Sequence, residues 1–167
     1  MAPDSVVEAS AALRRRRVAE ADAPDHLELR IWLRLLSSTR QIENFLKSRL
    51  RREFGTSLAR FDVLAQLDRF PEGLTLSEVS RHLMVSNGAI TGLVEKLAAD
   101  GLISREDHAE DKRTVIVRLT EAGSTTFRRM ARRHEEWVIS LLGDLSHEAQ
   151  TDLLRDLVLL KRSLGSQ

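Results

Sequence analysis

Residues 75–101 read TLSEVSRHLMVSNGAITGLVEKLAADG and predict two short helices joined by a tight turn. Thr75 begins a capping box, because its hydroxyl can accept a hydrogen bond from the backbone N–H three residues on while Glu78 reaches back to the cap. The first helix is expected to end near Met84, and Ser86 is expected to cap the second. Two closely joined short helices, the second of them capped, form a helix-turn-helix pattern.

The pattern of apolar residues changes directly after this segment. Residues 102–106 read as a strand, residues 107–112 as a polar turn, and residues 114–120 as a second, alternating strand. A β-hairpin that follows a helix-turn-helix is a wing. Helical periodicity accounts for the flanks, at residues 25–54, 57–70, 121–142 and 146–164. The predicted fold class is therefore mainly α with a small β-hairpin wing, a winged helix-turn-helix core between N- and C-terminal helices.

The second helix of the helix-turn-helix has an apolar face and a small, polar face. The apolar residues recur at helical spacing and are expected to face inward; they are Ile90, Leu93, Val94 and Leu97. The other face suits a DNA major groove, since Asn and Thr can bond base edges and the first-turn N–H groups can hold a phosphate. Its candidate DNA contacts are Ser86, Asn87, Gly88, Ala89, Thr91 and Gly92. An ordinary surface helix, with weak helix formers serving as caps, is the alternative.

Basic residues cluster around the turn of the predicted wing. An arginine at a hairpin tip can enter a narrow minor groove, where the negative potential is strongest. Asp111 lies two residues before Arg113 and can pair with a guanidinium, which would hold the hairpin in shape. The candidate DNA contacts of the wing are Arg105, His108, Lys112 and Arg113. Composition alone favours an ordinary mixed-charge turn, because the net charge is only +1 and residues 56–120 are slightly acidic.

A family resemblance is carried by residues 111–123, DKRTVIVRLTEAG. This stretch contains D-x-R, a strand, and then L-T-x-x-G opening a helix, and it resembles the wing signature of the MarR (multiple antibiotic resistance regulator) family. Residues 74–86, 92–97 and 100–105 match the family pattern as well, and the resemblance extends over roughly residues 27–164. It implies a double-stranded, roughly palindromic DNA operator, and usually repression that a small molecule relieves.

The resemblance also implies a homodimer whose first, fifth and sixth helices intertwine. The residues also favour a dimer, because the terminal helices are too apolar for a monomer of this size. Apolar side chains lie on two adjacent sides, as at Trp32 and Leu33 and at Trp137 and Val138, and the last helix is rich in Leu. We therefore expect a mobile arm at 1–24, a dimerisation helix at 25–55, a DNA-binding lobe at 56–120 and C-terminal dimerisation helices at 121–167.

Effector pockets in this family lie between the dimerisation helices and the DNA-binding lobe. The candidate lining residues are Trp32, Leu36, Arg40, Phe54, Phe61, Ala65 and His134. Plain core packing is the alternative for each apolar one, and His134 can equally be a core histidine. Residues 84–88 and 91–94 resemble regulators of aromatic-acid catabolism, which favours an aromatic acid, free or as its coenzyme A thioester. The Arg14–Arg17 run could grip DNA phosphates, bind effector phosphates, or form a solvated arm.

Several other function classes find no support in the sequence. There is no Cys for peroxide sensing and no pair of His at i, i+4, so we expect neither a metal nor a cofactor. No nucleophile–base set or phosphate loop suggests an enzyme. No apolar run approaches a membrane span and no secretory signal is evident, so a cytoplasmic location is expected. The remaining alternative is a winged-helix module that binds proteins without specific DNA binding.

Overall fold

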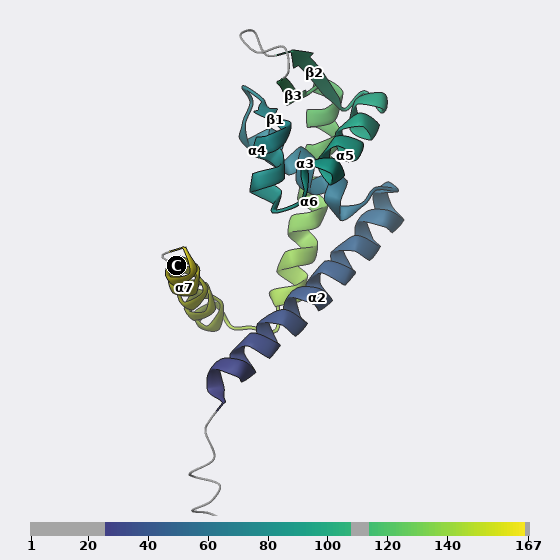
Figure 1. Ribbon diagram of the computed structural model, residues 1–167. Helices are drawn as coiled ribbons and strands as arrows, with labels where there is room; N and C mark the ends of the chain where they lie inside the picture. The colour runs from purple at the N-terminus through teal and green to yellow at the C-terminus, as the bar shows by residue number, and fades with distance from the viewer. Residues whose placement is uncertain (1–25, 108–113, 166–167) are drawn as a thin grey trace, which may run out of the picture. The chain divides into compact units, whose positions relative to one another are not determined.

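The computed structural model describes residues 26–107 and 114–165 (Figure 1). Helices predominate, and a small antiparallel sheet contains the wing hairpin, so the predicted fold class is confirmed. In chain order the elements are α2 (Leu27–Phe54), α3 (Leu58–Arg69), β1 (Leu74–Thr75), α4 (Leu76–Leu83), α5 (Asn87–Ala99), β2 (Ile103–Asp107), β3 (Val115–Leu119), α6 (Glu121–Leu142) and α7 (His147–Leu164). None of the described helices is long and apolar enough to cross a membrane.

The chain divides into two compact units, residues 1–41 and residues 42–167. The described part of the first unit is the N-terminal half of α2. The second unit holds the remaining elements. The predicted arm at 1–24 lies outside the described residues, and the predicted division of the chain by role stays a prediction.

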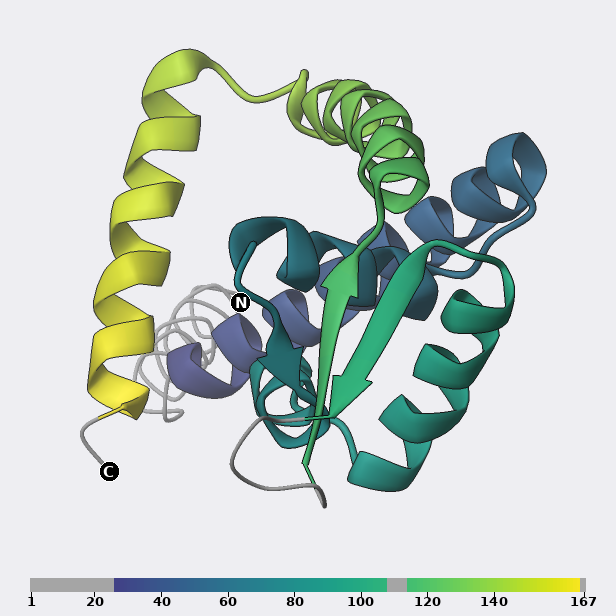
Figure 2. The same cartoon turned by 90° about the horizontal axis from the view of Figure 1, so that it is seen from above.

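A three-stranded antiparallel sheet has the order β1-β3-β2. The β2 and β3 strands form the predicted wing hairpin, with Ile103 opposite Leu119 and Arg105 opposite Val117 (Figure 2). The two-residue β1 pairs Leu74 with Val117 and was not predicted. This pairing connects the start of the helix-turn-helix to the middle of β3, so the helix-turn-helix and the wing share one sheet.

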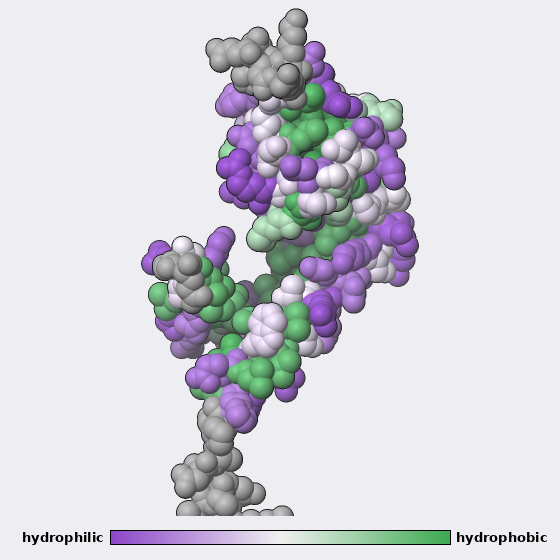
Figure 3. Space-filling model, in the orientation of Figure 1, coloured by the Kyte–Doolittle hydropathy of each residue, from purple (hydrophilic) through white to green (hydrophobic). Residues whose placement is uncertain are grey.

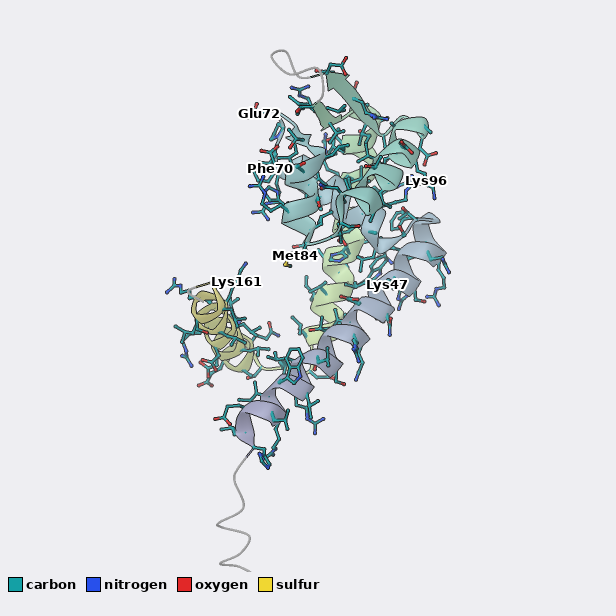
Figure 4. The ribbon with its side chains drawn as sticks, viewed as in Figure 1. Lys47, Phe70, Glu72, Met84, Lys96 and Lys161 are labelled. Atoms are coloured by element: carbon teal, nitrogen blue, oxygen red, sulfur yellow. The ribbon has the colours of Figure 1, made fainter. Side chains whose placement is uncertain are left out.

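The helix-turn-helix has the predicted caps. The Thr75 backbone N–H donates to Glu78 Oε2 at 2.8 Å, and Thr75 Oγ1 accepts from the Glu78 backbone N–H at 3.2 Å. Ser86 Oγ accepts from the Ala89 backbone N–H at 3.4 Å and begins α5. Between the two helices, Met84 adopts the left-handed conformation with φ 54° and leaves its side chain exposed (Figure 4).

One hydrophobic core anchors α5 and the sheet. Ile90, Val94 and Leu97 of α5 are fully buried, as predicted for its inner face, and Leu93 is partly buried. They pack in one cluster with buried residues of the neighbouring elements, namely Leu50, Val63, Leu64, Leu67, Val79 and Val117. Burying a side chain of this size contributes about 1.5–3 kcal/mol, so the orientation of α5 is strongly determined.

The junction between wing and α6 explains the L-T-x-x-G motif. Thr120 Oγ1 donates to the Gly101 carbonyl at 2.7 Å and accepts from the Gly123 backbone N–H at 3.0 Å. A Cβ at position 123 would lie 1.8 Å from the Leu102 carbonyl oxygen. Only glycine therefore allows the first turn of α6 to approach the backbone that leads into β2.

Large apolar side chains are exposed on the described terminal segments, but the side chain of Trp137 is buried. In the first unit, Trp32 is 56% exposed and Leu33 is 53% exposed. In the second unit, α7 has no buried residue, and apolar side chains are visible on its surface (Figure 3). Trp137, whose helix side was used to argue for dimerisation, is buried beside Phe54, with ring centroids 6.3 Å apart, and adds nothing to this exposed surface.

Candidate DNA-binding site

The N-terminal half of α5 presents its small, polar face outward. Asn87, Gly88 and Ala89 are exposed, and Thr91 and Gly92 are partly exposed. This orientation follows from the fully buried residues on the opposite side of the helix. The structure therefore brings the predicted contacts of this helix together on one surface.

Two glycines on this face have no structural role within the described protein. A Cβ added at Gly88 or at Gly92 would meet no atom within 4 Å, and neither residue has a positive φ. Glycine within a helix costs about 1 kcal/mol relative to alanine. Since no internal contact requires them, their small size suits the close approach of another molecule to this face.

The polar side chains of this face differ in the groups that they leave free. Thr91 Oγ1 donates its hydrogen to the Asn87 carbonyl at 3.0 Å, one turn earlier in the helix. Ser86 Oγ accepts from Ala89 and donates its own hydrogen to none of the described residues. Among the described residues, the side-chain amide of Asn87 has no hydrogen-bond partner, so its donor and acceptor both remain free.

A notch of about 250 Å³ lies between this helix and the end of the wing hairpin nearest its turn. Asn87 and Thr91 form one side of it, and α4 and the start of β3 form the other. The lining residues are Thr75, Leu76, Ser77, Asn87, Thr91, Thr114 and Val115. Ser77 and Thr114 were not predicted as site residues, and no local sequence signal marks them, because only the folding of α4 and the wing places them beside α5.

The two arginines of the described wing strands have different environments. Arg118 on β3 donates from Nε to the Glu72 carbonyl at 2.7 Å and pairs with Glu106, so it fastens the wing to the preceding loop. Arg105 on β2 is exposed and has no ion-pair partner among the described residues. Within the described strands of the wing, Arg105 is therefore an unpaired cation. The other wing candidates, His108, Asp111, Lys112 and Arg113, lie outside the described residues.

The candidate effector residues of the second unit lie in or against its core. Phe61 is buried and Phe54 and Ala65 pack against the cluster. The His134 ring stacks on Phe61 with centroids 4.7 Å apart, and burial lowers the pKa of His134 below its usual value, which favours the neutral ring at pH 7. These contacts fit the core-packing alternative. The remaining candidates, Trp32, Leu36 and Arg40, belong to the first unit, where Trp32 and Arg40 are exposed and Leu36 is partly exposed.

An exposed, capped second helix beside a β-hairpin defines the class of protein as winged helix-turn-helix. A sequence profile of the MarR family matches residues 54–114. An HTH-type transcriptional regulator of Bacillus cereus is 30% identical over 128 residues, which are 77% of this chain and 84% of the relative. A MarR family transcriptional regulator from Silicibacter pomeroyi has a similar structure, with a TM-score of 0.70 and 32% identity over 87% of this chain and 98% of that one.

The chain therefore belongs to the MarR family. Its fold is also similar to Sco3205, a MarR family regulator from Streptomyces coelicolor solved in complex with DNA, with a TM-score of 0.74, 24% identity and coverage of 86% of this chain and 92% of that one. MarR family members are DNA-binding transcription regulators and not enzymes, so family membership confirms the predictions of the family and of a non-enzymatic role.

Proposed function

We propose that this regulator recognises a specific, roughly palindromic operator by inserting the N-terminal half of α5 into the major groove. The carrying observation is the outward face of α5, where the free amide of Asn87 stands among residues too small to obstruct a base edge. Asn87 is suited to a bidentate contact with adenine. The regulator most simply acts as a repressor, which a small-molecule effector releases from the operator.

The residues around Asn87 have supporting roles in this proposal. The free hydrogen of Ser86 and the first-turn N–H groups of α5 contact a phosphate. Arg105 contacts the backbone beside the minor groove. At the wing tip, His108, Lys112 and Arg113 meet the minor groove or its flanking phosphates, and Asp111 holds the hairpin in shape.

The homodimer is proposed from the apolar surface of the terminal helices. Several large apolar side chains of α7 are between 38% and 64% exposed, and leaving such surface in water is unfavourable at about 25 cal/mol per Å². A two-fold dimer would cover it and would present two α5 helices to half-sites about 34 Å apart, one turn of DNA.

The effector is proposed to be an aromatic acid, free or as its coenzyme A thioester. The support is the resemblance of residues 84–88 and 91–94 to regulators of aromatic-acid catabolism. Benzoate, hydroxycinnamates and their thioesters should be titrated into the protein–operator complex while bound DNA is followed by fluorescence anisotropy. Release by an aromatic ligand, but not by an aliphatic acid of equal charge, is the expected result.

Selection of DNA fragments by the purified protein, followed by sequencing, tests the proposed function. We expect enrichment of an inverted repeat, and loss of that enrichment when Asn87 is replaced with Ala. Asn44 is exposed on α2, so Asn44→Ala is a matched control that should select the same repeat. If the wild-type protein enriches no motif, the chain does not read DNA sequence and the protein-interaction alternative gains support.

A further inference from the structure

We propose that Thr91 reads the operator as a hydrogen-bond acceptor and selects a base that carries an exocyclic amino group in the major groove. Adenine presents such a group at N6 and cytosine at N4, whereas guanine and thymine present acceptors at the corresponding positions. This inference rests on the proposed function, since it assigns a base preference to a residue of the same DNA-binding face.

The direction of one hydrogen bond carries the inference. A threonine hydroxyl has a single hydrogen to donate and two lone pairs that can accept. In this protein the hydrogen of Thr91 Oγ1 is committed to the Asn87 carbonyl at 3.0 Å. The oxygen can then offer only its lone pairs to a third partner. A base that presents an N–H group matches this state, and a base that presents a carbonyl oxygen opposes it.

The position of Thr91 is suitable for contact with a base. Thr91 lies four residues after Asn87, which places both on one side of α5 about 6 Å apart along the axis. Both line the notch beside the start of β3, and Thr91 is partly exposed. Successive bases on one strand are separated by about 3.4 Å. The base read by Thr91 should therefore lie within about two steps of the base read by Asn87.

The base preference expected for Thr91 differs from the preferences expected for the neighbouring Ser86 and Asn87. Within the described part of the chain, Ser86 keeps a free hydrogen, which suits a phosphate oxygen, and Asn87 keeps both a donor and an acceptor, which suits adenine. Thr91 is thus the residue among these three whose hydrogen is already used within the helix. If its hydroxyl instead turned away from the Asn87 carbonyl on DNA, Thr91 would donate, and guanine or thymine would be preferred.

Selection experiments with two variants test the preference. Thr91→Val keeps the shape and the methyl group but removes the oxygen, and Thr91→Ser keeps the oxygen. The wild-type protein and the serine variant should enrich adenine or cytosine at one position of each half-site. The valine variant should lose preference at that position while retaining the rest of the motif. A wild-type preference for guanine or thymine at the position that changes in Thr91→Val would overturn the inference.

Removal of the amino group from the DNA provides the second measurement. The base at that position in one half-site is replaced by purine if it is adenine, or by 2-pyrimidinone if it is cytosine. Wild-type affinity should fall on the order of tenfold, whereas the affinity of Thr91→Val should barely respond. Equal losses for both proteins would overturn the inference. A wild-type protein that enriches no motif at all would instead reject the proposed function, so the two failures are distinguishable.

Discussion

At the scale of single residues, Gly92 lowers the stability of α5, and no contact within the described protein requires a glycine there. A Cβ at this position meets no atom within 4 Å, and alanine is the better helix former. We expect Gly92→Ala to raise the free energy of unfolding by about 0.5–1 kcal/mol and to weaken operator binding, because the added methyl group obstructs close approach to DNA. Thermal denaturation and fluorescence anisotropy measure the two effects. Unchanged operator affinity would show that DNA does not approach α5 at this point.

Asp62 on α3 is predicted to make stability depend on pH. Burial raises the pKa of Asp62 to about 6, Glu43 adds to the increase, and Lys47 opposes it. The folded state therefore binds the proton more tightly than the unfolded state between about pH 4 and 6, and stability falls as pH rises through this window. Asp62→Asn should stabilise the protein at pH 8 by about 1 kcal/mol after allowance for solvent screening.

The measurement for Asp62 is chemical denaturation at pH 4 and at pH 8. The gain from Asp62→Asn should nearly vanish at pH 4, where the wild-type carboxyl is protonated. Asp68 lies on the same helix and is exposed, so Asp68→Asn is the matched control. An equal gain at both pH values would mean that the effect does not come from the charge of Asp62.

At the scale of secondary-structure elements, Gly123 determines how closely α6 approaches β2. Its missing side chain leaves room for the Leu102 carbonyl, which would lie 1.8 Å from a Cβ. Because the backbone of Gly123 and the backbone of Leu102 make this contact, neither can move without displacing a helix or a strand. We expect Gly123→Ala to destabilise the protein by at least about 1–3 kcal/mol. Gly143→Ala, where the nearest atom lies at 3.4 Å, is the milder comparison in the same denaturation experiment.

The wing strand β2 carries Arg105, whose proposed contact with DNA can be tested. Arg105 is exposed and unpaired among the described residues, so its proposed partner is a DNA phosphate. Arg105→Ala should lower the slope of log K against log salt by about one for each protomer. Arg132, an exposed arginine of α6 outside the proposed face, provides the control Arg132→Ala. An unaltered slope for Arg105→Ala would remove this residue from the DNA contacts.

At the scale of the whole molecule, the exposed apolar face of α7 predicts self-association. Light scattering at micromolar concentration should give about twice the chain mass of 18.9 kDa. Leu157→Glu, on the apolar face of α7, should shift the protein toward the monomer because it places a charge in the proposed interface. Arg155→Glu lies on the opposite face of the helix and should leave the mass unchanged. A monomeric wild-type protein would contradict the proposed architecture.

The sequence by itself determined the individual elements of the fold. The capping box at Thr75 and Glu78, the cap at Ser86 and the alternating strand of the wing depend on residues that are near neighbours in the chain. Local hydrogen bonds and side-chain periodicity therefore act on them directly. The inner and outer faces of α5 followed from the same periodicity, and its predicted surface candidates do lie on one face.

Only the tertiary structure decided which of these residues are free to act. Strand β1 exists because Leu74 pairs with Val117, and the notch exists because Ser77 and Thr114 meet α5. Of the adjacent apolar residues Trp137 and Val138, Trp137 is buried in the core and Val138 is only partly buried. Arg118 is committed to Glu72 and Glu106, while Arg105 on the adjacent strand is unpaired among the described residues. The physical reason is that these outcomes depend on pairing between segments distant in the chain, which local periodicity does not specify.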